Sequence, residues 1–389
     1  MALSRPTPKP SLAGFKYFEQ LDSLLAPLRP ASTARDTAGN RQLYFDQYAQ
    51  LLLLYFFNPA VTSLRGVREF TTLEKVQRVF GIRPTALGSL SEAARVFDPT
   101  LLEPIIAELA ERALAQPTAR PPDERAALAG LIAVDGSLLP ALPRMAWALW
   151  QDATHRAAKV HVAFAVWPGV PIRATVTHGH SSEREQLRRM ARPGGFYVMD
   201  RGYAEYDLLR ELDARGARFV QRLQDNAAYD VVEEKALTDA DRAAGVVRDV
   251  VVRRLGTDKH NALLERPFRV VECGGGATGG RWTLATNALE LSADLVVVAY
   301  RHRWVIELFF RWLKCILGCR HLLAENRGGV TMQVYLAIIA SLVIGLWTGG
   351  KPTKRLYELL CHYFNGWATA EEVERYQKAL QSKTGPPSK

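Results

Sequence analysis

Cysteine is scarce in this sequence, with four residues in a chain of 389: Cys273, Cys315, Cys319 and Cys361. So few cysteines in so long a chain exclude a disulfide framework as the source of stability. Cys315 and Cys319 stand four residues apart on a predicted helix, and no second pair follows at the spacing of a zinc site. We therefore expect these two to be buried thiols and not metal ligands.

Long apolar runs are also scarce. Only residues 334–347 could be mistaken for a membrane span, and the run is shorter than the roughly 20 residues that a spanning helix needs. We expect a buried core helix there, and no membrane partner. The first fourteen residues lack the apolar stretch of a signal peptide.

The sequence shows no internal repeat and no phosphate-binding glycine loop. Its most glycine-rich stretch, residues 273–280, lacks the Lys-Ser/Thr ending of a P-loop and does not open an apolar helix. These absences argue against a solenoid protein and against a P-loop nucleotidase.

The chain is basic, with 50 Lys and Arg against 40 Asp and Glu and a formal net charge of +10. A basic surface suits a polyanion, which is either a nucleic acid or an anionic membrane face. An Ala- and Arg-rich composition from high-GC codon usage would give the same excess. Charge alone therefore does not choose between these explanations.

Hydrophobic periodicity divides the chain into segments. Apolar residues recur at helical spacing from residue 15 to about 118, after a basic N-terminus at 1–14 that we expect to be disordered. Pro-rich residues 117–122 read as a linker. We expect an α/β core in two parts, residues 119–225 and 281–350, with a β-rich insertion between them at 226–280. A basic helical tail is expected at 351–389.

The order of elements in the α/β core indicates its fold. Three strands come first, one ending near Asp135 and the next two joined by a hairpin at Pro168 and Gly169. A helix, a strand ending at Asp200, a second helix and a fifth strand follow. This is the ribonuclease H-like layout, and it predicts a mixed five-stranded sheet with helices. We expect residues 291–317 to form one long helix.

One face of that helix gathers a carboxylate among cations. At about 100° per residue, an arc of about 80° holds five polar side chains, which are Tyr300, Arg303, Glu307, Arg311 and Lys314. Apolar residues occupy the opposite side. The arrangement fits a solvated face with salt bridges between residues four apart. It also fits a site that binds a divalent metal and phosphates.

Two aspartates favour the metal and phosphate site over a merely solvated helix face. Asp135 and Asp200 each follow a β-prone run and precede a turn, where a lone aspartate is often only a turn residue. In a ribonuclease H-like sheet the first and fourth strands are neighbours, so their ends bring the two aspartates together. A helix across the sheet could add Glu307. Three such carboxylates can hold two Mg²⁺ or Mn²⁺ ions about 3.5–4 Å apart for in-line phosphodiester chemistry.

These residues resemble a known family. Tyr300-x2-Arg303-x3-Glu307-x6-Lys314 is similar to the Y-R-E-K signature of the insertion-sequence 4 family of DDE transposases. Residues 134–142 and 198–212 resemble the blocks around that family's two aspartates. The resemblance covers roughly residues 120–345, and the helical module at 15–118 fits the family's DNA-binding region.

The resemblance implies a role for each matching residue. Asp135, Asp200 and Glu307 would bind the metals and catalyse the reaction, while Tyr300, Arg303 and Lys314 would contact DNA at the transposon end. Further DNA contacts are candidates by position at Arg311, Arg201, Arg222 and Trp282, of which Trp282 could hold a flipped base or simply pack in the core.

The implied function is cut-and-paste transposition. The partners would be double-stranded DNA, as terminal inverted repeats and target, and a second copy of the chain in a synaptic homodimer. The setting would be the bacterial cytoplasm, in association with the nucleoid. Two alternatives stay open: a catalytically silent DNA-binding protein derived from such an enzyme, and a ribonuclease H-like nuclease.

Overall fold

The computed structural model describes residues 16–33, 39–116, 123–152, 154–257, 260–274, 280–319, 321–349 and 352–384. The expected disordered N-terminus at 1–14, the linker at 117–122 and most of the glycine-rich stretch lie outside the described residues. The chain forms two compact units. One comprises residues 1–116, 139–158 and 311–389, and the other comprises 117–138 and 159–310.

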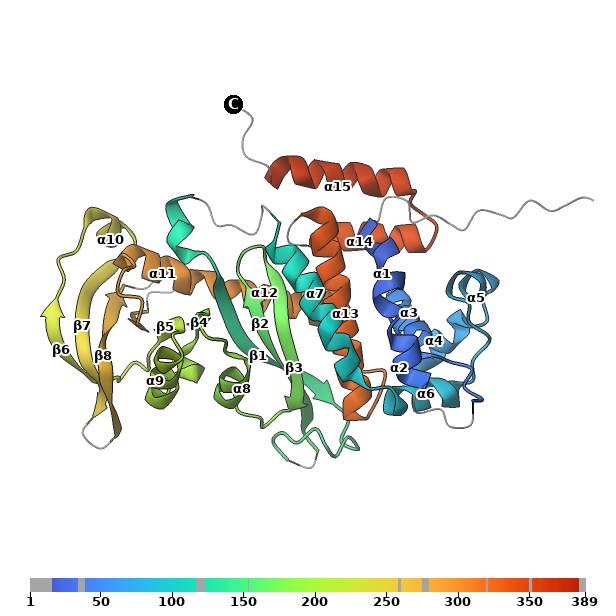
Figure 1. The fold of residues 1–389 in the computed structure, drawn as a ribbon, viewed down its shortest axis with the longest axis horizontal. Coiled ribbons are helices and arrows are strands. Elements are labelled where there is room, and N and C mark those ends of the chain that lie inside the picture. The colour runs from blue at the N-terminus through green and yellow to red at the C-terminus, as the bar shows by residue number, and fades with distance from the viewer. Residues whose placement is uncertain are drawn as a thin grey trace, which may run out of the picture. The chain divides into compact units, whose positions relative to one another are not determined.

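The second unit is built on a mixed nine-stranded sheet of order β3-β2-β1-β4-β5-β9-β8-β7-β6 (Figure 1). Its strands are β1 (Leu131–Ala141), β2 (Arg156–Ala165), β3 (Val170–His178), β4 (Phe196–Met199), β5 (Arg218–Arg222), β6 (Tyr229–Glu234), β7 (Val246–Thr257), β8 (His260–Cys273) and β9 (Trp282–Thr286). Strand β4 pairs in parallel with β1 and β5, while β9 runs antiparallel to β5. The first five strands thus lie in the order expected of a ribonuclease H-like core.

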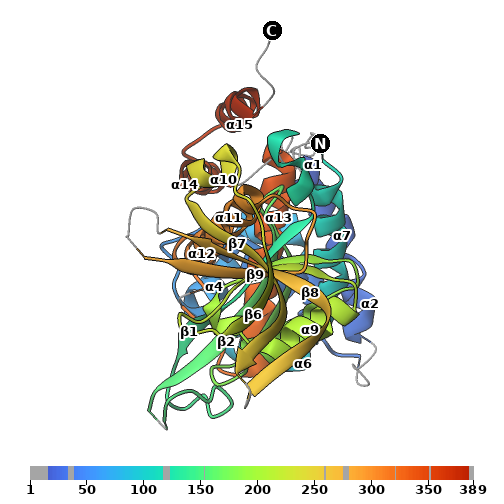
Figure 2. The ribbon, with the colours of Figure 1, turned by 90° about the vertical axis from the view of Figure 1, so that its left-hand side faces the viewer.

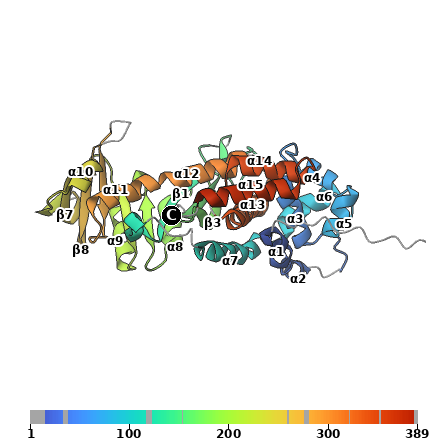
Figure 3. The same ribbon diagram turned by 90° about the horizontal axis from the view of Figure 1, so that it is seen from above.

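Helices cover both faces of this sheet. They are η3 (Asp123–Leu128), α8 (Glu183–Met190), η4 (Arg201–Tyr203), α9 (Tyr206–Ala214), α10 (Asp239–Ala243), α11 (Ala293–His302) and α12 (Trp304–Arg311). Figure 3 shows α8 and α9 on one face and α11 on the other, and the strands also separate α9 from α11 in Figure 2. Side chains of β4 alternate between the faces, as in any strand. Tyr197 and Met199 join the core beneath α8 and α9.

Helix α8 begins where the sequence predicts. Ser182 is its N-cap, and the Ser182 side chain accepts a hydrogen bond from the Glu185 backbone N–H at 3.4 Å. Helix α9 is followed by Gly216, whose φ of 69° is readily adopted by glycine. These local signals fix the helices that pack beside β4.

The predicted five-stranded sheet is too small. Strand β9 pairs with the free edge of β5, and the insertion then continues the same sheet through β8, β7 and β6. A buried ion pair ties the insertion to the core. Arg269 donates to both carboxylate oxygens of Asp249 at 2.7 Å, and it also donates to the backbone oxygen of Leu291. The insertion is therefore an extension of the core sheet.

The prediction of a single long helix over 291–317 is also wrong. Helix α11 ends at His302, α12 begins at Trp304, and residues Trp312–Ile316 form a π-helical turn, η5. At the break the backbone tightens, because the Arg303 N–H bonds the Tyr300 carbonyl and the Ile306 N–H bonds the Arg303 carbonyl. A constant rotation of 100° per residue therefore does not extend to Lys314.

The first unit is helical in its described residues, apart from the ends of β1 and β2. Its helices are α1 (Lys16–Leu25), α2 (Leu28–Thr33), α3 (Phe45–Phe56), α4 (Leu64–Phe70), α5 (Glu74–Phe80), α6 (Leu87–Val96), η1 (Pro99–Leu102), α7 (Glu103–Leu114), η5, α13 (Arg327–Thr348), α14 (Lys354–Phe364) and α15 (Ala370–Thr384). Helix α13 contacts α3, α6 and α7, so the N-terminal helices pack around a C-terminal one.

Helix α13 contains the apolar run singled out in the sequence. It is long and apolar enough to cross a membrane, but its apolar window is completely buried inside the protein. The expectation of a core helix is confirmed. Among the four cysteines, Cys319 is buried as predicted, whereas Cys315 is exposed and that part of the prediction is wrong. Cys315 lies in the π-helical turn, where the extrapolated helical periodicity no longer applies.

Candidate active site

Neighbouring parallel strands position the two aspartates. The paired register of β1 and β4 runs to Ala133 opposite Val198, so Asp135 and Asp200 each lie two residues further along. Strand β4 ends at Met199, and the Asp200 carboxylate caps η4 by accepting a hydrogen bond from the Gly202 N–H at 2.9 Å. The sequence predicted that the first strand ends near Asp135. That prediction is wrong, because β1 continues to Ala141.

Arg303 connects Glu307 with Asp135. Its guanidinium Nη2 lies 2.5 Å from the Glu307 Oε1, and its Nη1 lies 4.0 Å from the Asp135 Oδ2. All three side chains are at least half buried, with exposed fractions of 15% for Arg303, 19% for Asp135 and 32% for Glu307. The two carboxylates therefore share one guanidinium at the break between α11 and α12.

The Asp135 carboxyl has a strongly altered acidity. Burial raises its pKa to about 7, because an ionised carboxylate loses its hydration there. A backbone hydrogen bond from Gly136 acts in the opposite direction, the charges of Asp200 and Glu183 raise the pKa further, and Arg303 lowers it. Without a cation in the site, Asp135 is therefore partly protonated at neutral pH.

The donor set fits a hard divalent cation in its chemistry. Carboxylate oxygens are the ligands that Mg²⁺ and Mn²⁺ prefer. Within the part of the chain that the structure describes, no three His, Cys, Asp or Glu residues already stand at metal-binding spacing. The Glu307 carboxylate accepts a hydrogen bond from Arg303. For all three acids to bind a metal, Glu307 must leave Arg303 and bind the metal instead.

Aromatic and basic side chains continue the site from β9 to α11. Tyr300 is 7% exposed, and the Trp282 ring packs edge-on against it with 5.1 Å between centroids. The Arg222 guanidinium lies 6.0 Å from the Trp282 ring, and that of Arg303 lies 6.0 Å from the Tyr300 ring. Trp282, which sequence reasoning selected by position only, is thus in direct contact with Tyr300 of the signature.

The remaining sequence candidates lie elsewhere or in the other unit. Arg201 is exposed and bonds the Asp225 carboxylate at 3.3 Å, and Arg222 reaches the same carboxylate at 3.6 Å. Arg311 is exposed in the last turn of α12, and Lys314 is partly buried in the π-helical turn. Both of the latter belong to the first compact unit, so their DNA contacts stay predictions.

Sequence reasoning missed two residues that interact electrostatically with the aspartates, Glu183 and Tyr203. The charge of Glu183 acts on the Asp135 carboxyl, and the charges of Glu183, Asp135 and Asp200 all act on the Tyr203 hydroxyl. No spacing pattern could have found them, because their proximity depends on how α8 and η4 pack on the sheet. The one local signal was the Ser182 cap, which places Glu183 at the start of a helix.

Residues 127–343, more than half of the chain, match the family described as "Transposase DDE domain". A protein named as transposase y4zB of Sinorhizobium fredii is 29% identical over 53% of this chain and 58% of its own length. The transposase named for the insertion sequence IS5377 of Geobacillus stearothermophilus is 25% identical over 52% of each chain.

A third relative, named for the element IS4SA of Synechocystis, is 21% identical over 55% of this chain and 59% of its own length. The chain thus spans a little over half the length of these relatives. A piggyBac transposase, solved as a synaptic complex with hairpin DNA, aligns with 100% of this chain and 89% of its own at 10% identity and a TM-score of 0.45, too low to bear on the fold. By the match to its DDE domain, the chain belongs to the transposase DDE family.

Proposed function

We propose that this protein is a DNA transposase that cleaves DNA at transposon ends and joins those ends to target DNA. The observation that carries the proposal is the placement of Asp135 within β1 and of Asp200 just after the neighbouring parallel strand β4, with Arg303 linking Asp135 to Glu307. Family membership supports the reaction class. The bacterial cytoplasm would be its setting and double-stranded DNA its substrate.

Asp135, Asp200 and Glu307 would hold Mg²⁺ or Mn²⁺, two ions in the arrangement that phosphodiester chemistry commonly uses. Bound there, the metal would supply an activated water or 3′-hydroxyl and stabilise the leaving oxygen. The buried Asp135 carboxyl must lose its proton for this binding. Because its pKa is near 7, that loss is easy at physiological pH.

Arg303 would have two successive partners. In the structure it neutralises Glu307 and lies near Asp135. When the carboxylates bind metal, the guanidinium becomes available for a DNA phosphate, which its planar donor array suits. Tyr300 and Trp282 would support the DNA strand next to it, since aromatic rings stack on exposed bases. Arg222, Arg201, Arg311 and Lys314 are proposed as further phosphate contacts.

Cleavage of DNA that carries the transposon end tests this proposal. Wild-type protein should nick or cut labelled end DNA in Mg²⁺ and not in EDTA. Losing a partner of a metal ligand costs roughly 10–100-fold, so Glu307→Gln, which removes a ligand, should slow cleavage by at least about 100-fold.

The matched control is Glu290→Gln, because Glu290 is an exposed carboxylate of the same unit that only pairs with Arg218. It should cut at the wild-type rate. Undiminished cleavage by Glu307→Gln would show that Glu307 is not part of the metal site. DNA binding without any metal-dependent cleavage would favour the silent DNA-binding alternative.

A further inference from the structure

The turn that follows β4 is held by its backbone carbonyl groups. Asp200 comes directly after β4 and caps η4, so the position of this turn decides where the aspartate lies. Three consecutive carbonyl oxygens each accept a hydrogen bond from a side chain of another segment, and they belong to Asp200, Arg201 and Gly202. Exposed turns are among the more mobile parts of a fold, so these bonds restrict the movement of the aspartate.

Gln221 makes the innermost of the three bonds. It lies on β5 opposite Met199, the last residue of β4, and it is 0% exposed. Its Nε2 donates to the Asp200 carbonyl oxygen at 2.6 Å and to the Arg222 carbonyl oxygen at 2.5 Å. The buried amide therefore connects the end of β5 to the residue just after β4.

The same amide group contains an unpaired acceptor. The Gln221 Oε1 is buried and has no hydrogen-bond partner among the residues that the structure describes. A buried acceptor without a partner lowers stability, because it has lost its water. Leucine would fill a similar volume without that cost. The two bonds that Nε2 donates therefore explain this glutamine better than a gain in stability does.

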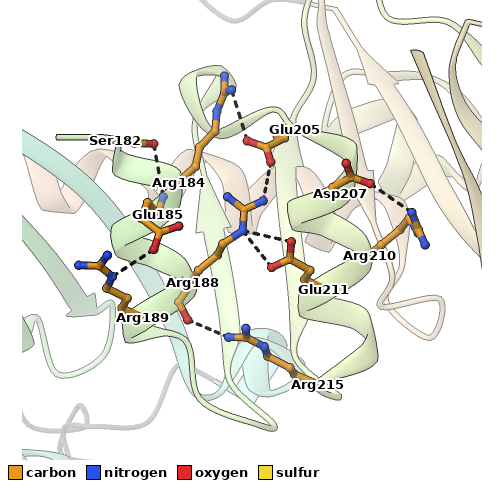
Figure 4. A network of polar contacts seen from close by, with 10 residues as sticks. All are labelled: Ser182, Arg184, Glu185, Arg188, Arg189, Glu205, Asp207, Arg210, Glu211 and Arg215. Atoms are coloured by element: carbon orange, nitrogen blue, oxygen red, sulfur yellow. Dashed lines mark hydrogen bonds and ion pairs between the residues drawn. The ribbon is translucent and has the colours of Figure 1, made fainter. Parts of the chain in front are cut away.

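Two further side chains donate to the same turn. The Gln224 Nε2, from the segment after β5, donates to the Arg201 carbonyl oxygen at 3.0 Å. The Arg184 Nε, from α8, donates to the Gly202 carbonyl oxygen at 3.0 Å. Arg184 also pairs with Glu205, which lies just before α9 (Figure 4). The turn is thus held both from the end of β5 and from α8.

The Asp200 carboxylate is fixed as well as its backbone. Its Oδ1 accepts a hydrogen bond from the Gly202 N–H at 2.9 Å, and a Cβ atom built on Gly202 would lie only 3.1 Å from that oxygen. Glycine at this position therefore lets the carboxylate fold over the turn. Tyr203 closes the turn with a side chain that is 1% exposed and joins the core beneath α8 and α9.

We propose that Gln221 and Gln224 are positioning residues of the active site, which hold the Asp200 turn so that its carboxylate is placed to bind the divalent cation. A ligand that is held in place in advance loses less conformational freedom when the cation binds. Both glutamines act through the Asp200 turn and not by contact with the cation. The inference rests on the proposed function, because it assumes that Asp200 binds that cation.

Mn²⁺ binding to the DNA-free protein, followed by electron paramagnetic resonance, tests the inference without an activity readout. Gln221→Leu keeps the side-chain volume and removes the donor, so it should weaken Mn²⁺ affinity by about 10-fold, the lower end of the effect of residues that support metal ligands. Gln224→Leu should weaken it several-fold. The matched control is Gln186→Leu, since Gln186 is a buried glutamine of the same unit that donates to Ser181 and not to the turn. It should bind Mn²⁺ as the wild type does.

A purely stabilising role gives a different pattern. In that case Gln221→Leu and Gln186→Leu both lower the melting temperature, and both bind Mn²⁺ as the wild type does. That result overturns the inference. If Gln221→Leu does not fold, Gln224→Leu decides, because an exposed side chain can be replaced without unfolding the core. Wild-type Mn²⁺ affinity in Gln224→Leu would then overturn the inference.

Asp200→Asn separates the inference from the proposed function. If the wild type binds Mn²⁺, Asp200→Asn does not, and both Gln221→Leu and Gln224→Leu bind normally, only the inference fails. If the wild type binds no Mn²⁺, or if Asp200→Asn binds as well as the wild type, the metal centre itself is wrong and both proposals fail.

Discussion

Asp135 is a buried acid whose ionisation destabilises the metal-free fold. Its pKa is about 7 in the folded protein and about 3.9 in an unfolded chain. The folded state therefore binds the proton more tightly, so this residue destabilises the metal-free fold as pH rises from about 4 to about 7. Above pH 7 the cost is constant.

Asp135→Asn should remove that cost in EDTA. The variant should melt progressively further above the wild type between pH 4.5 and pH 7, and the gap should level off beyond. Melting curves at several pH values measure it. A gap that stays constant, or that widens toward low pH, would show that Asp135 is not a buried acid of raised pKa.

At the residue scale the sequence predicts part of the candidate site. Asp135 and Asp200 could be paired in advance, because strand adjacency follows from the order of elements. Glu183 could not, since its charge acts on Asp135 only after α8 packs on the sheet. The position of Arg303 between Glu307 and Asp135 could not be predicted either. Helical spacing predicts the pairing of Arg303 with Glu307 but not its approach to Asp135.

Helix α8 connects β3 to β4, the strand that ends just before Asp200. Of its two consecutive arginines, Arg188 is 22% exposed and bridges Glu205 and Glu211, whereas Arg189 is 66% exposed and pairs only within the helix (Figure 4). Exposed pairs four apart contribute about 0.3–0.5 kcal/mol. A charge-assisted bond to a half-buried acid contributes roughly 1.5–3 kcal/mol.

Arg188→Met should therefore lower the urea midpoint of unfolding clearly, while Arg189→Met should stay close to the wild type. Both variants replace an arginine of α8 with methionine, so they change helix propensity and net charge by the same amount. Equal midpoints for the two variants would mean that the network in Figure 4 does not anchor α8.

Element boundaries were less predictable than element types. The apolar period runs unbroken through Arg303, so nothing local signals the break between α11 and α12 or the π-helical turn after it. Likewise, the β-rich insertion could be located from its composition. Its addition to the edge of β5 through β9 depends on long-range pairing, which no local pattern encodes.

At the scale of the whole molecule, the helices after residue 311 form one compact unit with the helices before residue 116. The sequence order separates these segments, so this assembly could not be predicted from periodicity. It follows from α13, whose buried surface needs partners on several sides.

The positive net charge leads to a prediction for DNA binding. Affinity should fall steeply as salt rises, because each neutralised phosphate releases bound counterions and contributes about 0.9 to the log–log slope. Arg311→Ala should reduce that slope by about one if Arg311 contacts a phosphate. Arg242→Ala is the control, since Arg242 is an exposed arginine of α10 that was not assigned to DNA. Binding that is insensitive to salt would count against extensive phosphate contacts.

Joining of a pre-cleaved transposon end to target DNA tests the central claim most directly. A nuclease cannot form this product, and in the proposed mechanism the reaction needs all three carboxylates. The wild type and Glu290→Gln should form joined molecules in Mg²⁺, whereas Asp135→Asn, Asp200→Asn and Glu307→Gln should form none above background. Joining that persists in the three variants, or wild-type protein that only hydrolyses DNA, would contradict the account.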